Sequence, residues 1–316
     1  MFIRSRLKIT KRLDTVSVPI GTGVIFQNLF EPLKAAWEID MITSRQNPLV
    51  VKLCKLSDKK YRDTERLFRF DGIKLFGEAV NFGVELEYIL IKSSAVEKLE
   101  GIVKDGFLKS KQQKSCELIL LSDSVFDKIS EEKSSEGIIC IAKYIDKIHK
   151  TVKIYNNDSF SSLNNKKILI AENIQDPGNL GTIIRSSFAF ENDVLVLSNC
   201  ADIYNSRVVR AAMGALFKQS IIIIPNIPDF ICGLVNCGRR VLATALDESA
   251  KNLNSITLNS NDCFVIGNEG HGLSKEALDA STDRIIIPMQ TGSESLNAGV
   301  AASICLWQRY SACTKQ

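Results

Sequence analysis

The sequence predicts an α/β fold in two domains, the second of which contains a parallel sheet. Short, wholly apolar runs alternate with stretches of helical periodicity, and such runs are typical of strands buried in a parallel sheet. Several runs in the second half lead into a polar, glycine-containing loop and then a helix start, the connection that open α/β sheets use at their ligand-binding edge. A chain of 316 residues is long enough for two hydrophobic cores.

The composition is that of an ordinary globular protein, with 45% hydrophobic and 24% charged residues. A formal net charge of +4 permits a nucleic-acid partner without requiring one. The nine cysteines form no CxxC pair and only two histidines are present, which argues against a zinc site or a disulfide framework. We therefore expect a cytoplasmic protein with reduced thiols and no bound metal.

Residues 1–40 differ from the rest and are expected to be a leader outside the fold. Basic residues crowd the first dozen positions, and the apolar stretch 16–30 is broken by Pro19 and two glycines. That stretch is too short and interrupted to span a membrane. The simplest interpretation is that Met41 is the natural start; a transit peptide is the alternative.

Residues 41–70 carry eight Lys or Arg against three acids. Leu49, Leu53 and Leu56 recur at helical spacing, while the cations, Arg62 among them, fall around another face, which predicts an amphipathic helix with a basic outer side. Such a face is either solvated surface or a contact for an RNA backbone. The expected RNA-binding residues are Arg45, Lys52, Lys55, Lys59 and Lys60.

The remainder of the first domain, taken as residues 41–150, reads as a small α/β binding module. Strands are expected at 67–70, 87–91, 118–121 and 137–144, with helices at 73–82 and 124–129. The segment has no paired carboxylates, no nucleophile–base pair and no glycine-rich phosphate loop. Residues 151–165, which include the polar uncharged run 155–165, are expected to be a linker.

The second domain, taken as residues 166–316, opens with a buried strand at 167–171 that runs into Glu172-Asn-Ile-Gln-Asp-Pro-Gly-Asn-Leu-Gly-Thr-Ile-Ile-Arg185. The Asp-Pro-Gly turn is followed by Asn179 or Thr182 as the expected helix start. Arg185 lies about one and a half helical turns beyond Asn179. It can hold a phosphate or carboxylate bidentately, and the alternative is a surface arginine.

Further strands are expected at 194–197, 221–224, 241–245 and 263–266, with a helix at 206–215 and Phe217 packing inward. The last of these strands leads into Gly267-Asn-Glu-Gly-His-Gly-Leu273. Three glycines in six residues indicate a close backbone approach or positive φ. The spacing fits neither the dinucleotide-binding GxGxxG motif nor a P-loop. His271, without a carboxylate nearby in sequence, is expected to be a loop histidine rather than a base.

A third strand–loop–helix unit closes the chain. The apolar run Ile285–Ile287 predicts a strand that Pro288 ends, because proline has no N–H for the ladder. Ser295 or Asn297 is expected to cap the following helix, which runs through Ala301, Ile304 and Trp307.

Together, the Asn173–Arg185, Ile266–Leu273 and Ile287–Asn297 runs resemble, in order and spacing, the three motifs of the SpoU (TrmH) RNA ribose 2′-O-methyltransferases of the SPOUT superfamily. The run Arg207–Ala215 is also similar to that family. Residues 41–144 resemble the ribosomal-protein-like domain that many members carry in front, whereas residues 1–40 match nothing there. A mild departure is Ala298-Gly299 after Asn297, where many members have Val and a small residue.

The resemblance implies a SPOUT-type parallel sheet with a C-terminal trefoil knot that binds S-adenosyl-L-methionine. It also implies a homodimer with the active site at the subunit interface. The residues implied to bind the cofactor lie in three loops: Thr244, Ala245, Gly267, Ile287, Met289, Ser295, Leu296 and Asn297.

The implied activity is methyl transfer to an RNA ribose 2′-oxygen, with Arg185 and Asn179 acting at the ribose and phosphate and Glu269, Ser295 and Asn297 supporting them. A guanidinium with a pKa above about 12 is a poor general base, so Arg185 is better suited to phosphate binding and charge stabilisation. Ribosomal RNA is the favoured substrate and transfer RNA the alternative. A non-catalytic RNA-binding protein on the same fold and a Rossmann-type nucleotide enzyme are the rival classes.

Overall fold

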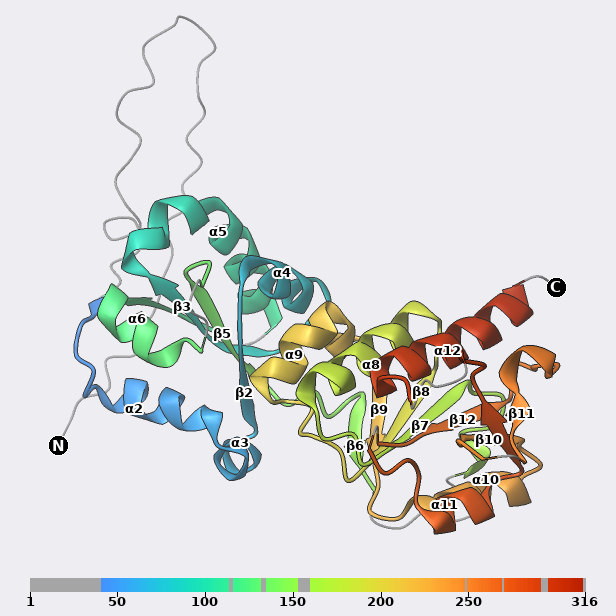
Figure 1. The fold of residues 1–316 in the computed structure, drawn as a ribbon. Helices are drawn as coiled ribbons and strands as arrows, with labels where there is room; N and C mark the ends of the chain where they lie inside the picture. The colour runs from blue at the N-terminus through green and yellow to red at the C-terminus, as the bar shows by residue number, and fades with distance from the viewer. Residues whose placement is uncertain are drawn as a thin grey trace, which may run out of the picture.

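The computed structural model describes residues 41–113, 116–131, 135–152, 160–247, 249–268, 270–290 and 295–314. The expected leader 1–40, positions 153–159 of the expected linker, and Glu269 lie outside the described residues. Figure 1 shows two α/β domains side by side, with the first domain in blue to green and the second in yellow-green to red.

The first domain is built on a five-stranded mixed sheet with the order β1-β4-β3-β5-β2. Strand β4 runs parallel to β1 and β3, whereas β5 runs antiparallel to β3 and β2. Its elements are β1 (Met41–Ile42), α2 (Pro48–Cys54), α3 (Lys59–Glu65), β2 (Leu67–Asp71), α4 (Ile73–Asn81), β3 (Leu86–Lys92), α5 (Val96–Gln113), β4 (Glu117–Leu121), α6 (Asp123–Ile129) and β5 (Ile138–Lys143).

Strand alternation builds a core on each face of this sheet. Along β5, Ile138 and Cys140 join the cluster under α4 and α5, whereas Ile139 and Ile141 join the cluster under α2 and α6. This is the period of two expected for a strand that is buried on both faces. All four expected strands of this domain and the two expected helices, at 73–82 and 124–129, are confirmed to within two residues, whereas no helix is expected from the sequence at α5.

The single basic amphipathic helix expected in 49–62 is wrong in two respects. A short 3₁₀ turn, Lys55–Ser57, interrupts it, and Asp58 caps the new helix α3 by accepting a hydrogen bond from the Tyr61 N–H at 2.9 Å. Arg62 is buried rather than on the outer face. Asp58 is a strong N-cap residue, which explains the break.

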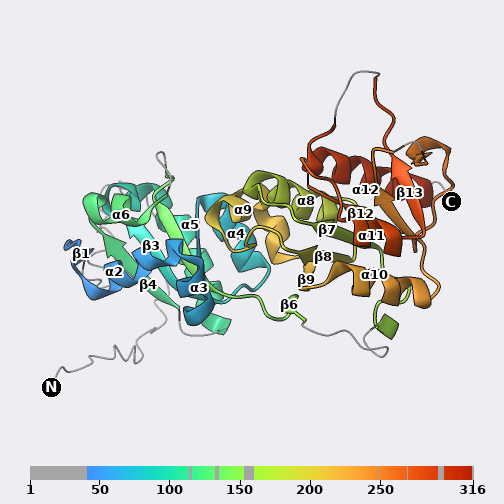
Figure 2. The same cartoon turned by 60° about the horizontal axis from the view of Figure 1, so that its bottom comes forward.

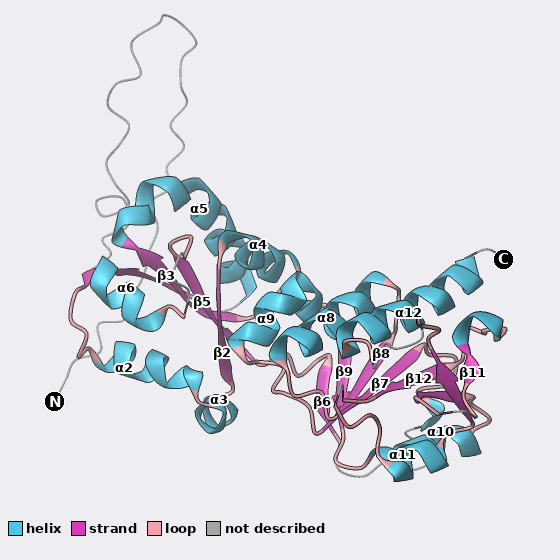
Figure 3. Cartoon of the chain, in the orientation of Figure 1, coloured by secondary structure: helices cyan, strands magenta, loops and turns pink. Residues whose placement is uncertain are grey.

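The second domain contains an eight-stranded sheet, order β11-β13-β10-β12-β7-β8-β9-β6, in which every neighbouring pair is parallel. Helices cover both faces, with α8, α9 and α12 on one side and α10 and α11 on the other (Figures 1 and 3). Its elements are β6 (His149–Thr151), β7 (Ile168–Glu172), α8 (Pro177–Ala189), β8 (Val194–Ser198), α9 (Ser206–Ala212), β9 (Ser220–Ile223), α10 (Ile227–Asn236), β10 (Val241–Thr244), β11 (Lys251–Asn252), β12 (Cys263–Ile266), α11 (Lys275–Ala280), β13 (Asp283–Ile286) and α12 (Ala298–Thr314).

Two details of this domain differ from expectation. Helix α8 begins at Pro177 rather than at Asn179 or Thr182, because Asp176 accepts a hydrogen bond from the Asn179 N–H at 2.8 Å and proline is well suited to the first turn. Helix α9 ends at Ala212 and continues as a 3₁₀ helix, Met213–Phe217, in which Phe217 is buried as expected.

The expected linker 151–165 contributes to the second domain. Strand β6 pairs with β9, so the second sheet begins at His149, two residues before the expected boundary. Phe160 and Leu163 are buried in the core beneath α10. Because the residues around Phe160 and Leu163 are polar, composition alone predicts a linker here.

The two domains share one continuous hydrophobic cluster. Phe68 of β2 packs against Tyr204, with ring centroids 4.7 Å apart, and Phe70 packs against Phe217 at 5.3 Å. Figure 2 shows the same junction, where α4 lies beside α9. Among the described residues, no helix combines the length and apolar character needed to cross a membrane.

Candidate active site

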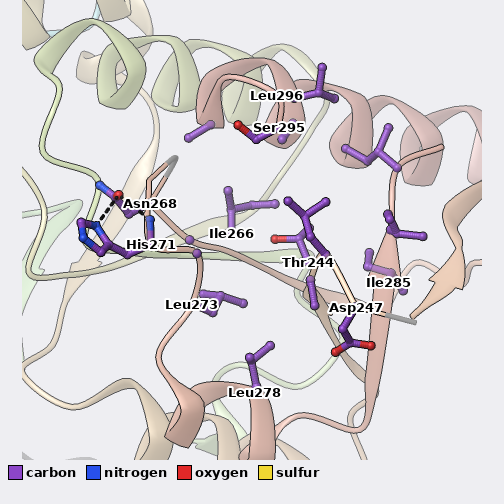
Figure 4. A pocket seen from close by; sticks show the side chains of 18 of the residues that line it. Thr244, Asp247, Ile266, Asn268, His271, Leu273, Leu278, Ile285, Ser295 and Leu296 are labelled. Carbon is purple, nitrogen blue, oxygen red and sulfur yellow. Dashed lines mark hydrogen bonds between the residues drawn. The ribbon is translucent and has the colours of Figure 1, made fainter. Parts of the chain in front are cut away.

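A cavity of about 400 Å³ lies where β10, β12 and β13 end and α12 begins (Figure 4). Seven of the eight residues expected to bind the cofactor line it; Asn297 does not. The complete lining is Thr244, Ala245, Leu246, Asp247, Ile266, Gly267, Asn268, Gly270, His271, Gly272, Leu273, Leu278, Ile285, Ile286, Ile287, Met289, Ser295, Leu296, Ala298 and Ala301. The lining therefore comes from residues within 244–247, 266–273 and 285–301, together with Leu278 of α11.

The glycine loop after β12 forms one wall by folding back on itself. Asn268 and Gly272 form an isolated antiparallel bridge, and Gly272 has a φ of +68°. A Cβ on Gly267 would lie 2.4 Å from the carbonyl carbon of Gly272, far inside van der Waals contact. Glycine is therefore required at position 267 by the close approach, as the sequence predicts.

Asn268 organises this loop from within. Its side-chain oxygen accepts hydrogen bonds from the N–H of Gly270 at 2.8 Å and of His271 at 3.2 Å. Its amide donates to the carbonyl of Asn173 at 3.1 Å, which ties the loop to the end of β7. Sequence reasoning did not single out Asn268, although an asparagine inside a glycine-rich turn is a recognisable signal for such a role.

The cavity is apolar in its depth and polar at its edges. Ile266, Leu273 and Leu278 surround its centre, and Thr244 donates from its hydroxyl to the carbonyl of Val265 at 3.1 Å. At the rim, hydrogen bonds from Ser249 and then from Arg284 lower the pKa of Asp247, so this carboxylate is charged at neutral pH. Sequence reasoning also missed Asp247, whose signal is its place three residues after the buried strand β10.

Asn297 and Asn179 meet beside the cavity. The Asn297 amide donates to the side-chain oxygen of Asn179 at 2.7 Å, and its own oxygen accepts from the Val300 N–H at 3.2 Å, which caps α12 as predicted. The helices behind this pair pack closely, with the hydroxyls of Ser186 and Ser303 2.7 Å apart. The first and third sequence motifs are thus brought together.

Arg185 lies on the exposed face of α8 and does not line the cavity. Its guanidinium makes no ion pair or hydrogen bond with any residue that the structure describes. Asn179 does not line the cavity either, so the expectation that both side chains point into one cleft stays a prediction. A charged group left free at the surface remains available for a substrate anion.

The expected RNA-binding cations of the first domain are mostly engaged with neighbours. Lys52 pairs with Glu65 at 2.6 Å, and Lys59 pairs with Asp63 at 2.8 Å. Lys55 lies 5.8 Å from the centre of the Tyr61 ring, and the Arg45 Nε donates to the Ser124 carbonyl at 3.1 Å. Lys60 is exposed. The pairs at Lys52 and Lys59 reduce the free positive charge on this surface.

These features define the class of the molecule: an α/β protein with a glycine-walled, largely apolar ligand cavity, packed against a small α/β module. Residues 166–307 match the SpoU rRNA methylase family, and residues 47–140 match the MRM3-like substrate binding domain. The chain thus contains a SpoU methylase domain behind an MRM3-like substrate binding domain, which confirms the resemblance found in its motifs.

Known relatives span both domains. The 23S rRNA (guanosine(2553)-2′-O)-methyltransferase RlmP of Bacillus subtilis is 28% identical over 268 residues, which cover 84% of this chain and 97% of that protein. The mitochondrial rRNA methyltransferase 3 of Homo sapiens is 27% identical over 312 residues, covering 80% and 69%. The AdoMet-bound rRNA methyltransferase of Sinorhizobium meliloti shares the fold, with a TM-score of 0.71, 24% identity and coverage of 86% and 97%.

Proposed function

We propose that this protein transfers the methyl group of S-adenosyl-L-methionine to a ribose 2′-hydroxyl of ribosomal RNA. The observation that carries the proposal is the convergence of the three SpoU motifs, with two around one cavity and the first joined to the third through Asn179 and Asn297. The names of RlmP and of the human relative favour ribosomal RNA over transfer RNA as the substrate.

The cavity suits the proposed cofactor in size and chemistry. A volume of about 400 Å³ lies within the range of small-molecule sites. Its apolar walls fit an adenine ring, and the backbone of the turn at Gly267, which lines the cavity, would bind the adenine edge. Thr244, Ala245, Gly267, Ile287, Met289, Ser295 and Leu296 would hold the cofactor. When bound, S-adenosyl-L-methionine supplies a methyl group that is reactive because it is attached to a positively charged sulfonium sulfur.

The residues of this chain would align and stabilise the acceptor. The Asn179–Asn297 pair would orient the ribose, with Ser295 and Glu269 in support. Arg185 would bind the adjacent phosphate and stabilise the negative charge that develops on the 2′-oxygen as its proton leaves. This role requires a permanently charged guanidinium and does not require Arg185 to act as a base.

The C-terminal strands support the proposed trefoil knot. Strand β13 lies between β10 and β11, which are consecutive along the chain and joined by a loop. Helix α12, which follows β13, then packs against α8 and β12 on the other side of β10. Because β13 is inserted between two strands that a loop already joins, this arrangement supports a chain that passes through the β10–β11 loop. Such threading is a rare exception to ordinary chain topology.

Helix α12 supports the proposed homodimer. Val300, Ile304 and Trp307 recur at helical spacing along one stripe, and Val300 and Trp307 are 45% and 51% exposed. Trp307 also contacts Phe190, with ring centroids 5.6 Å apart, so the apolar surface extends towards α8. A second copy of the chain is the proposed partner that covers this stripe, with the active site at the interface.

The first domain is proposed to bind the RNA substrate, with Arg45, Lys52, Lys55, Lys59 and Lys60 as backbone contacts. All nine cysteines are free thiols, which supports the proposed location in the cytoplasm, a reducing compartment.

A methyl-transfer assay with tritiated S-adenosyl-L-methionine tests the activity. Ribosomal RNA from cells lacking the gene should accept label at one ribose, and transfer RNA should not. Label on transfer RNA alone would show that transfer RNA, and not ribosomal RNA, is the substrate. Cofactor binding without methyl transfer to any RNA would indicate a non-catalytic RNA-binding protein.

A further inference from the structure

The junction between the domains contains a second cavity, of about 300 Å³, separate from the proposed cofactor site. Its walls come from both domains: Leu56, Ser57, Arg62, Arg69 and Glu131 from the first, and Tyr204, Asn205, Ser206 and Arg207 from the second. Three arginines therefore line one cavity, which makes it a candidate site for an anion.

Two of these arginines are buried and hold the domains together. Arg62 pairs with Asp202 of the second domain at 2.6 Å and donates to the carbonyls of Leu56 and Ser57 at 2.7 and 2.8 Å. Arg69 pairs with Glu131, whose other oxygen accepts a hydrogen bond from the Ser206 hydroxyl. These contacts bridge the domains and fix the shape of the cavity.

The third arginine is different. Arg207, on the first turn of α9, is exposed, and its guanidinium makes no hydrogen bond or ion pair within the part of the chain that the structure describes. The lining contains three arginines and one carboxylate, Glu131, which pairs with Arg69, and Asp202 pairs with Arg62. The cavity therefore keeps a positive charge that neither carboxylate neutralises.

We propose that this interdomain cavity binds a phosphate of the RNA backbone, with Arg207 as the direct contact. The inference rests on the proposed RNA methyltransferase function and adds a site to it. Phosphodiester is the anion that this substrate supplies, and a planar guanidinium can bind its oxygens bidentately. The buried Arg62 and Arg69 increase the local positive potential while remaining in their structural pairs.

The site also links the two parts of the molecule. Helix α9 packs against α8, where Gly181 allows the two helices to approach so closely that a Cβ would lie 2.4 Å from the Cβ of Ala211. Helix α8 carries Arg185. A strand of RNA held by Arg207 at the domain junction would therefore lie between the front domain and the helix that carries the proposed catalytic arginine.

The test compares Arg207→Ala, Arg207→Lys and Lys275→Ala. Lys275 is an exposed cation on α11, on the opposite side of the sheet from α9, and serves as the matched control. Binding of a fluorescein-labelled oligouridylate would be followed by anisotropy from about 50 to 200 mM salt. Arg207→Ala should weaken binding about tenfold and reduce the salt slope by about 0.9, the value for one lost phosphate contact.

Arg207→Lys should restore part of the affinity and most of the salt slope, and Lys275→Ala should match wild type. Cofactor binding and the midpoint of thermal unfolding should not change in any variant. Equal affinity and slope in Arg207→Ala and wild type, or equal losses in Arg207→Ala and Lys275→Ala, would overturn this site. A wild-type protein that binds and methylates no RNA would instead overturn the proposed function.

Discussion

Arg185 is the residue on which the proposed chemistry depends most. Arg185→Ala should reduce single-turnover methylation by about 100-fold or more, because it removes charge stabilisation made in the transition state. Cofactor affinity should stay unchanged, since Arg185 does not line the cavity. Arg185→Lys should recover only part of the rate, because an ammonium lacks the planar two-pronged contact. Wild-type turnover in the alanine variant would remove Arg185 from the reaction.

Gly267 tests the cavity wall independently of the chemistry. Gly267→Ala would place a Cβ 2.4 Å from the Gly272 backbone, so the loop must shift and cofactor affinity should fall about tenfold or more. The control is Gly77→Ala in α4, where a Cβ meets nothing within 4 Å. Calorimetric titration of S-adenosyl-L-methionine measures both. An unchanged dissociation constant in Gly267→Ala would show that the loop does not contact the cofactor.

At the scale of elements, α2 and α3 decide whether the first domain contributes charge to RNA binding. Replacement of Lys52, Lys55, Lys59 and Lys60 by Glu should weaken RNA binding and flatten its dependence on salt, because fewer counterions are released. Lys52 and Lys59 are already paired with acids, so Lys55 and Lys60 should account for most of the loss. Anisotropy titrations that compare a Lys52→Glu, Lys59→Glu double variant with a Lys55→Glu, Lys60→Glu double variant separate these contributions. No change in either would mark the face as solvated surface.

Helix α12 has a structural and a proposed assembly role on different faces. Its buried Arg309 donates to the carbonyls of Asp262 at 2.7 Å and Ile168 at 3.1 Å, which anchors the helix to the sheet. Its outer stripe leaves Trp307 half exposed. If the proposed dimer forms through this stripe, Trp307→Glu should convert it to monomer without unfolding the domain. Light scattering after size exclusion, with circular dichroism as the folding control, measures this; a dimeric Glu variant would place the interface elsewhere.

At the scale of the whole molecule, His149 couples stability to pH at the domain junction. Burial lowers the pKa of His149 from 6.5 to about 4, and its Nδ1 lies 2.7 Å from the Tyr204 hydroxyl. Below pH 6.5 the unfolded chain binds this proton more readily than the folded protein, so stability falls as the pH drops towards 4 and is retained above 6.5. The loss attributable to this group is about 3 kcal/mol.

The His149→Gln variant isolates that contribution, because glutamine can still accept a hydrogen bond from Tyr204 but does not titrate. Urea unfolding at a series of pH values should show the wild-type curve falling more steeply than the variant curve between pH 6.5 and 4. Parallel curves would mean that His149 does not contribute to the acid sensitivity of the junction.

Properties encoded locally could be predicted from the sequence alone. Strand β12 was placed at its observed bounds, the glycine requirement at Gly267 was recognised, and the three motifs identified the family. Each of these depends on residues adjacent in the chain: apolar runs form strands, proline ends them, and clustered glycines mark a close backbone approach. Seven of the eight residues that the family resemblance implied to bind the cofactor line the cavity.

Only the tertiary structure decided which of these residues meet. Arg62 has the helical spacing of a surface cation, yet a carboxylate 140 positions away, Asp202, draws it into the junction. Phe160 and Leu163 lie among polar residues and still anchor a core, and Arg185 is exposed on α8, outside the cavity that the second and third motifs line. Burial and ion pairing depend on partners that are distant in the chain. The periodicity of apolar residues, by contrast, shows only which residues share a face of one helix or strand.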